Sequence, residues 1–276
     1  MSLTVTSVYS LCPAGDLPET AACDLSPEKL HGCCNQEHLQ ELNTLLPKSV
    51  SLRRVPRLAR LALRAALEVQ PEASAKQALV LNVAYGSVGS TFEFLDSIIN
   101  DGPALASPTA FSHSVTNMTA AYLCQYLNLT GPALTLTQQS FAAALETAEI
   151  LLDSGQAETV LLGIIAENSE SMAQIEEITG RPLSDLADGA VFFQLKAAEA
   201  GCDGVTVQHR RVPVCPNDHP NIEEDSRLFA VSSPLAAALR LALACHELSE
   251  KSAGTISFIC GDDQIIVTAS KSRGVI

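Results

Sequence analysis

Residues 129–164, LTGPALTLTQQSFAAALETAEILLDSGQAETVLLGI, indicate the fold class most clearly. Residues 133–137 combine apolar and β-branched side chains after a turn and predict a short strand. Residues 141–152 are rich in alanine, leucine and glutamate at helical spacing, and Gly155 follows them as a helix stop. Residues 159–165 form a short apolar run that is typical of a buried strand. The stretch therefore predicts a strand, a helix and a second strand in succession.

The same alternation of strand and helix patterns continues on both sides of this stretch. Before it, we expect strands at residues 3–8 and 78–84, helices at 55–69, 90–99 and 115–127, and a loop through Ser107 and Pro108. After it, we expect a strand at 190–195 that residues 205–209 continue, a helix at 234–248, and strands at 255–260 and 264–269. Alternating elements predict a layered α/β fold with a mainly parallel sheet. The turn-rich insert at residues 10–47 has no clear interpretation.

Composition and charge exclude several classes of function. The formal net charge of -14 disfavours nucleic acid as a partner, because its phosphates are repelled by an acidic surface. Apolar runs are interrupted by charge before the roughly 18 residues that a membrane span needs. The first nine residues also lack the basic flank and apolar core of a signal peptide. We therefore expect a cytoplasmic globular protein.

The cysteines favour neither a disulfide framework nor a metal site. Their number, nine, is odd, and no CxxC pair occurs, so we expect reduced thiols. One tract contains metal-ligating residue types at spacings that match no familiar zinc pattern: His31, Cys33, Cys34 and His38. We expect neither a metal nor a cofactor.

One local cluster of basic residues stands out in this acidic chain. Its members lie along the expected helix at residues 55–69 and just before it: Arg53, Arg54, Arg57, Arg60 and Arg64. Their spacing puts most of them on one helix face. This face is either a solvated or ion-paired surface or a contact site for an acidic partner.

Several short motifs occur in the order in which they are found in β-ketoacyl synthases. They are the arginine-led helix, SPTAFSHSVTNM at residues 107–118, LTGP at 129–132, GQAETVLLG at 155–163 with Glu167, and DGAV at 188–191. The chain resembles this family over roughly residues 50–200. The resemblance is closest to the truncated subunits, called chain-length factors, that pair with a full-length ketosynthase in aryl polyene and other type II polyketide systems.

This resemblance implies a thiolase-like layered αβαβα fold with a truncated C-terminal half. Residues 1–200 would form the ketosynthase-like half and residues 201–276 the reduced second half, together in one compact unit.

The position of the family's catalytic cysteine is degenerate in this chain. Counting forward from the LTGP motif places Ser140 at that position, whereas counting backward from Gly155 places Gln138 there. We favour Gln138, because chain-length factors and loading decarboxylases of the family carry glutamine at this point. An amide has no ionisable proton to lose and cannot form the acyl-thioester intermediate. The family's two histidine motifs also lack counterparts, so we expect no catalytic residue.

The resemblance implies roles for further residues. Four residues of the strand after the LTGP motif would form the dimer interface: Leu134, Thr135, Leu136 and Thr137. Five residues would line the acyl tunnel that runs to the interface: Thr109, Ala110, Phe111, Asn117 and Met118. Small Thr109 and Ala110 would lengthen the tunnel, unless Phe111 closes it. Acyl carrier protein would reach the complex, with a possible contact at Arg53, Arg54 and Arg57.

Two enzymatic alternatives remain open from the sequence. With Gln138 at the cysteine position, the chain would be a malonyl-carrier decarboxylase, although that reaction still needs the absent histidines. With Ser140 as nucleophile, it would be an acyl hydrolase, although the GxSxG pattern and a paired base are both missing.

Overall fold

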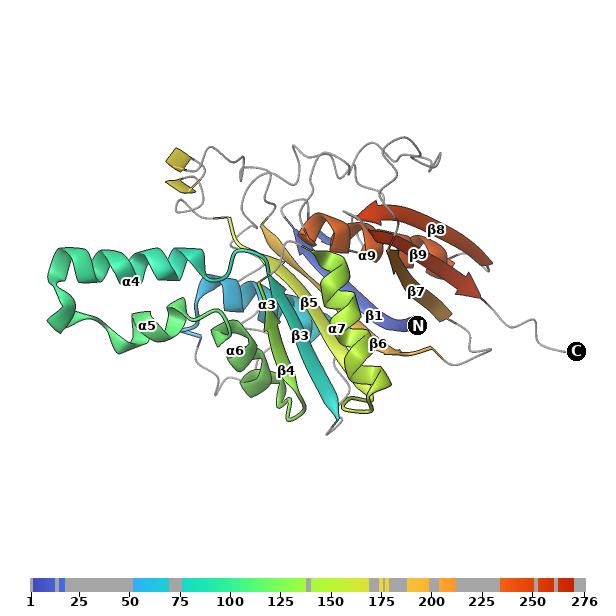
Figure 1. Cartoon of the computed structure of the whole chain (residues 1–276), viewed down its shortest axis with the longest axis horizontal. Coiled ribbons are helices and arrows are strands. Elements are labelled where there is room, and N and C mark those ends of the chain that lie inside the picture. Colours follow the sequence, from blue (N-terminus) through green and yellow to red (C-terminus); the bar gives the residue numbers. More distant parts are fainter. Residues whose placement is uncertain are drawn as a thin grey trace, which may run out of the picture.

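The structure is a computed structural model that describes residues 2–12, 15–17, 52–69, 76–137, 140–168, 174–175, 177–178, 188–198, 204–211, 234–250, 253–260 and 263–270. These residues form one nine-stranded sheet with the order β4-β3-β5-β6-β1-β7-β9-β8, and β2 pairs with β1 (Figure 1). The strands are β1 (Leu3–Cys12), β2 (Gly15–Leu17), β3 (Gln77–Val83), β4 (Ala133–Leu136), β5 (Thr159–Ala166), β6 (Gly189–Ala197), β7 (Gly204–Arg211), β8 (Ala253–Cys260) and β9 (Asp263–Ser270). The helices are α3 (Arg57–Val69), α4 (Val88–Asp101), the 3-10 turn η1 (Pro103–Leu105), α5 (Pro108–Ser114), α6 (Met118–Leu127), α7 (Phe141–Asp153) and α9 (Pro234–Glu250).

The expected layered α/β class is confirmed, but the prediction of a mainly parallel sheet is wrong. Only β3 pairs in parallel, with β4 and with β5, whereas the other described strand pairs are antiparallel. Antiparallel neighbours such as β5 and β6 need no crossover helix to join them. The expectation that residues 205–209 continue the strand at 190–195 is also wrong, because β1 lies between β6 and β7.

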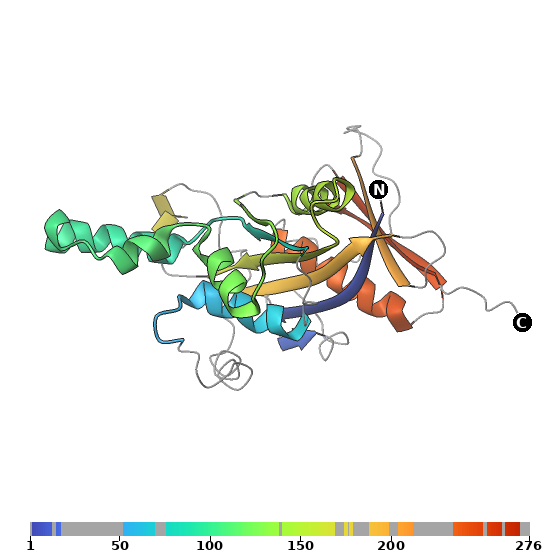
Figure 2. The same ribbon diagram turned by 90° about the horizontal axis from the view of Figure 1, so that it is seen from below.

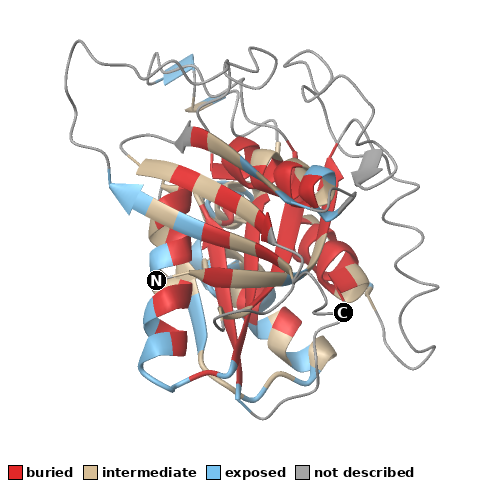
Figure 3. Cartoon of the chain, turned by 90° about the vertical axis from the view of Figure 1, so that its right-hand side faces the viewer, coloured by how far each residue is buried: buried red, intermediate tan, exposed pale blue. Residues whose placement is uncertain are grey.

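Alternate side chains of the central strands point to opposite faces of the sheet and bury two separate clusters. Ala78 and Val80 of β3 pack with α7 and α9 on one face. Leu79 and Leu81 of the same strand pack with α3 and α6 on the other. Figure 3 shows the buried residues concentrated on the strands and on the inward sides of the helices. The continuous apolar runs at β3 and β5 follow from this burial on both faces.

The helices α4 and α5 project from the sheet as an arm, which we define as residues 88–114 (Figures 1 and 2). Neither helix contains a buried residue. The loop expected at Ser107 and Pro108 is instead the start of α5: Ser107 accepts a hydrogen bond from the Ala110 amide, and Pro108 occupies the first turn. The helix expected from residue 115 begins at Met118, because the backbone at Val115 is extended.

Candidate functional site

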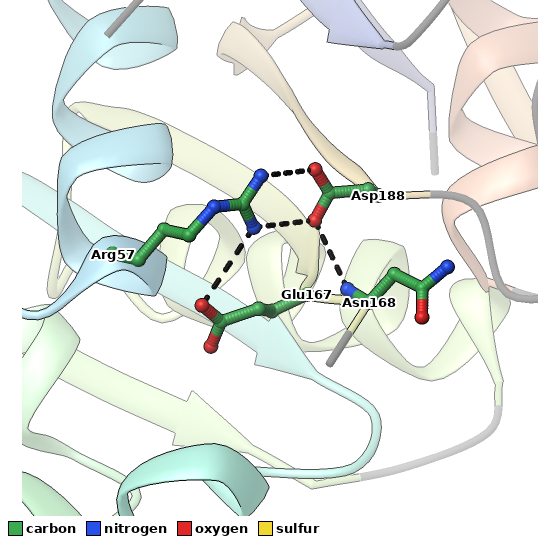
Figure 4. A network of polar contacts seen from close by, with 4 residues as sticks. All are labelled: Arg57, Glu167, Asn168 and Asp188. Atoms are coloured by element: carbon green, nitrogen blue, oxygen red, sulfur yellow. Dashed lines mark hydrogen bonds and ion pairs between the residues drawn. The ribbon is translucent and has the colours of Figure 1, made fainter. Parts of the chain in front are cut away.

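A network of charged groups joins the start of α3 to two neighbouring strands (Figure 4). The antiparallel register places Ala166 of β5 opposite Gly189 of β6, so Glu167 and Asp188 lie at the same edge of the sheet. Arg57, the first residue of α3, donates to both carboxylate oxygens of Asp188, at 2.8 Å and 2.5 Å. The backbone N–H of Asn168 donates a hydrogen bond to Asp188 Oδ1 at 3.0 Å.

Glu167 is the second carboxylate of this network. Its Oε1 lies 3.7 Å from Arg57 Nη1, which is an ion-pair contact too long for a strong hydrogen bond. Burial raises the pKa of Glu167, the Arg57 guanidinium lowers it, and the neighbouring Asp188 carboxylate raises it again. Since Asp188 has no exposed side-chain area, it is the carboxylate that holds Arg57 in place.

A cleft of about 640 Å³ opens beside this network, between the start of α3 and the arm. One wall carries four of the arginines of the basic cluster, Arg53, Arg54, Arg57 and Arg60. The arm and the residue that follows β5 supply the rest of the lining: Gly89, Ser90, Glu93, Thr109, His113 and Glu167. The structure therefore brings the arginines together with Thr109, which the sequence placed at a separate tunnel site. Sequence reasoning missed Glu93 and His113, because no local pattern links the arm to α3.

The five arginines have different surroundings. Arg53 and Arg54 precede α3 and are exposed. Arg57 is held by Asp188, and Arg64 is buried, with Glu68 at 2.6 Å and the Tyr9 ring beneath its guanidinium. The Nε atom of Arg60 is buried and has no hydrogen-bond partner among the described residues. Arg53 and Arg54 are therefore the most accessible of the cationic side chains at the cleft.

The two candidates for the degenerate cysteine position differ in what the structure describes. Gln138 lies outside the described residues. Ser140 is the N-cap of α7, where its hydroxyl accepts a hydrogen bond from the Ala143 amide at 3.2 Å. Its carbonyl accepts a hydrogen bond from the Asn82 side chain. The hydroxyl contacts no histidine or carboxylate of the described residues, so its visible role is to cap the helix.

The thiols of Cys124 and Cys245 are not activated. Cys12, Cys124 and Cys245 are free rather than disulfide-bonded. Burial raises the pKa of Cys124, and it raises the pKa of Cys245 to about 12. Because the thiolate is the nucleophilic form, neither Cys124 nor Cys245 is set up for covalent catalysis.

The five residues expected to line a tunnel lie on the arm and at the start of α6. Thr109 is exposed and lines the cleft, and Ala110 is half-buried. Phe111 is 56% exposed and contacts the Phe94 ring edge-to-face, with 5.5 Å between centroids. Asn117 is exposed at the N-cap position of α6, and Met118 follows it, half-buried. All five residues therefore lie within one short stretch of the chain, from α5 to the start of α6.

The strand expected at the dimer interface lies at one end of the sheet. β4 pairs with β3 alone, with Leu134 opposite Val80 and Leu136 opposite Asn82. Leu134 is 40% exposed, and Thr137 follows the strand end in an exposed position. The outer edge of β4 therefore offers backbone groups that no described strand covers.

The described residues include no group of three or more histidine, cysteine, aspartate and glutamate side chains placed to hold a metal ion. The tract at residues 31–38 lies outside them. The described helices also fall short of the length and apolarity that crossing a membrane requires.

The comparison with protein families identifies the chain. A family model described as the N-terminal domain of β-ketoacyl synthases matches residues 29–174, which is more than half of the sequence. The chain belongs to the β-ketoacyl synthase family. The matched residues include both the SPTAFSHSVTNM and the LTGP motifs. Gly131 of the second motif has a structural reason, because a Cβ atom there would overlap the Gln77 carbonyl. No curated protein matches the chain significantly.

Solved ketosynthase structures have the same fold. The chain is similar to "The ishigamide ketosynthase/chain length factor", with a TM-score of 0.68, 16% identity, and coverage of 98% of this chain and 100% of the other. It is also similar to "Ketosynthase (ApeO) in Complex with its Chain Length Factor (ApeC) from Xenorhabdus doucetiae", with a TM-score of 0.61, 16% identity, and coverage of 97% and 99%. At these identities the similarity establishes the thiolase-like fold, which confirms that prediction.

Proposed function

We propose that this chain is a non-catalytic chain-length-factor subunit that forms a heterodimer with an active β-ketoacyl synthase and shapes its acyl tunnel. Two observations carry the proposal together: β4 has an open outer edge, and the arm carries exposed apolar side chains. In the arm and the residue that follows it, the exposed large apolar residues are Leu95, Ile99, Leu105, Phe111 and Val115. Apolar side chains exposed over one projecting segment are typical of an interface with another protein.

The absence of a thiol at residues 138–140 supports a silent subunit rather than an enzyme. Ser140, the only hydroxyl among these residues, caps α7 and has no described base beside it. The similarity to ketosynthase complexes that contain chain-length factors is in keeping with this role. In the proposed unit, residues 1–200 are the ketosynthase-like half, and residues 201–276 add β7, β9 and β8 to the same sheet.

The first test is co-expression with a full-length ketosynthase, followed by size-exclusion chromatography with light scattering and an acylation assay. We expect a one-to-one complex in which only the cysteine-bearing partner is acylated. Leu134→Asp should break the complex, because it places a charge on the open edge of β4. Ile150→Asp is the matched control, since Ile150 is 58% exposed on α7. A stable monomer of this chain, or turnover by it alone, would refute the proposal.

The tunnel assignment has its own test. Ala110→Phe should shorten the products of the complex, because it fills space that the small side chain leaves open. The alternative plug is tested by Phe111→Ala, which should lengthen the products if Phe111 closes the tunnel. Both residues lie on the arm, where α5 has no buried residue, so neither variant should unfold the chain. Unchanged product lengths for both variants would refute the assignment of the arm residues to the tunnel wall.

For the carrier protein, we propose that Arg53 and Arg54 make the contact and that Arg57, held by Asp188, anchors the cleft wall. The double variant Arg53→Glu, Arg54→Glu should weaken carrier binding to the complex in a salt-dependent manner. Reversal of the exposed pair Arg210 and Arg211 on β7 is the control with equal change in net charge. Equal affinities for the two double variants would dismiss the contact.

A further inference from the structure

A second pair of charged groups lies away from the cleft, between α7 and β7. Glu149 Oε2 of α7 is 3.4 Å from His209 Nδ1 of β7, and the two side chains are 11% and 17% exposed. The other carboxylate oxygen, Glu149 Oε1, and the His209 Nδ1 atom are both buried and have no hydrogen-bond partner among the described residues, so the two side chains form an ion-pair contact rather than a hydrogen bond. A largely buried carboxylate of this kind is costly unless a cation offsets its charge.

The strand pattern shows why His209 reaches this carboxylate. Val205 and Val207 of β7 are buried against the helices, and His209 is the next residue on the same face. In the neighbouring strand β9, buried Ile265 lies opposite His209. His209 thus follows two buried valines on the same face of β7, a position where an apolar side chain would continue the pattern. The histidine contributes a charge that such a residue would not.

The charged groups that act on His209 come from two elements. The Glu149 carboxylate raises the pKa of His209 above its usual value, partial burial lowers it, and the carboxylates of Asp263 on β9 and Glu146 on α7 raise it further. The part of β1 that pairs with β7 consists of Leu3, Thr4 and Val5 and carries no charge. Among the described residues, α9 also packs on this face and adds no charge that acts on His209.

We propose that Glu149 and His209 form a pH-responsive brace that holds the strands β7, β9 and β8 against α7 while His209 is protonated. The brace connects the C-terminal strands to the helix α7, whose N-cap is Ser140, one of the two candidates for the degenerate cysteine position. It does not depend on the proposed function. A histidine whose pKa is raised in the folded state stabilises the fold fully below its unfolded pKa of about 6.5. That contribution is lost as the pH rises through the folded-state pKa.

The test uses the purified full chain, with urea unfolding measured between about pH 5.5 and 9. The wild type should lose more stability than His209→Gln as the pH rises above about 6.5, because only the wild type loses the charge. His113→Gln is the control, because His113 contacts Tyr122, which packs on the α3 face of the sheet, opposite the α7 face that carries His209. Its pH profile should follow that of the wild type. Parallel profiles for the wild type and His209→Gln would overturn the brace.

A direct titration keeps the proposal falsifiable where His209→Gln does not fold. The ring protons of His209 should titrate at a higher pH in the wild type than in Glu149→Gln, as measured by nuclear magnetic resonance. If His209 titrates at the same pH with and without the Glu149 charge, the pair is packed side by side without acting as a brace.

Discussion

Substitution of Asp188 by Asn should destabilise the protein more than removal of the other carboxylate at the same arginine. Asp188 has no exposed side-chain area and accepts two hydrogen bonds from Arg57 and one from the Asn168 amide. Asparagine keeps the shape of the side chain but removes its charge. Its NH₂ group, a donor, would also face the N–H donors of Arg57 or the backbone N–H of Asn168. Breaking a buried pair costs roughly 3–5 kcal/mol, because it leaves an uncompensated charge.

The expected loss lies near the lower end of that range, at about 3 kcal/mol, since the Arg57 side chain is 28% exposed and keeps Glu167 at 3.7 Å. For a chain of this size, it corresponds to a fall of about 6–12 °C in Tm. Differential scanning calorimetry and urea unfolding at neutral pH measure it. Glu167→Gln is the matched control and should cost less than about 1 kcal/mol. The reasoning is refuted if Asp188→Asn unfolds within about 0.5 kcal/mol of the wild type, or if the two variants lose equal stability.

Two further variants test local packing and capping. Gly163→Ala should destabilise by roughly 1–3 kcal/mol in urea unfolding, because the added Cβ would lie 2.5 Å from Phe192 Cζ and 2.8 Å from Leu81 Cδ1. A neutral effect would mean that the Phe192 ring can move aside. Ser140→Ala should cost about 1 kcal/mol through loss of the cap on the Ala143 amide. It should leave acylation of the proposed complex unchanged, whereas loss of an acyl-hydrolase activity on this substitution would favour the enzymatic alternative.

Much of the local structure follows from the sequence because its causes are local. The runs at β3 and β5 are apolar without interruption because both faces of these strands are covered. The helix α7 follows from small residues at helical spacing and a serine cap. The start of α5 was missed although Ser107 and Pro108 form a recognisable cap and first-turn pair, because the Ser-Pro dipeptide also favours turns.

Sheet direction was not predictable in the same way. The apolar runs at β5 and β6 fit parallel and antiparallel pairing equally. The insertion of β1 between β6 and β7 depends on pairs far apart in the sequence, such as Leu3 with Ala197 and Leu3 with Val207. The candidate site has the same limitation. Arginine spacing indicated a basic face, but only the fold shows that Asp188 holds Arg57 while Arg53 and Arg54 stay exposed.

Family membership, the order of most elements and the lack of a thiol at residues 138–140 follow from the sequence alone, because motif order and residue identity are properties of the chain. The fold is needed to show which charges are paired, that β4 lies at the sheet edge, that the arm and the arginines share a cleft, and that Glu149 contacts His209. These features join residues far apart in the sequence. Their geometry is set by strand order and helix packing, which no local pattern encodes.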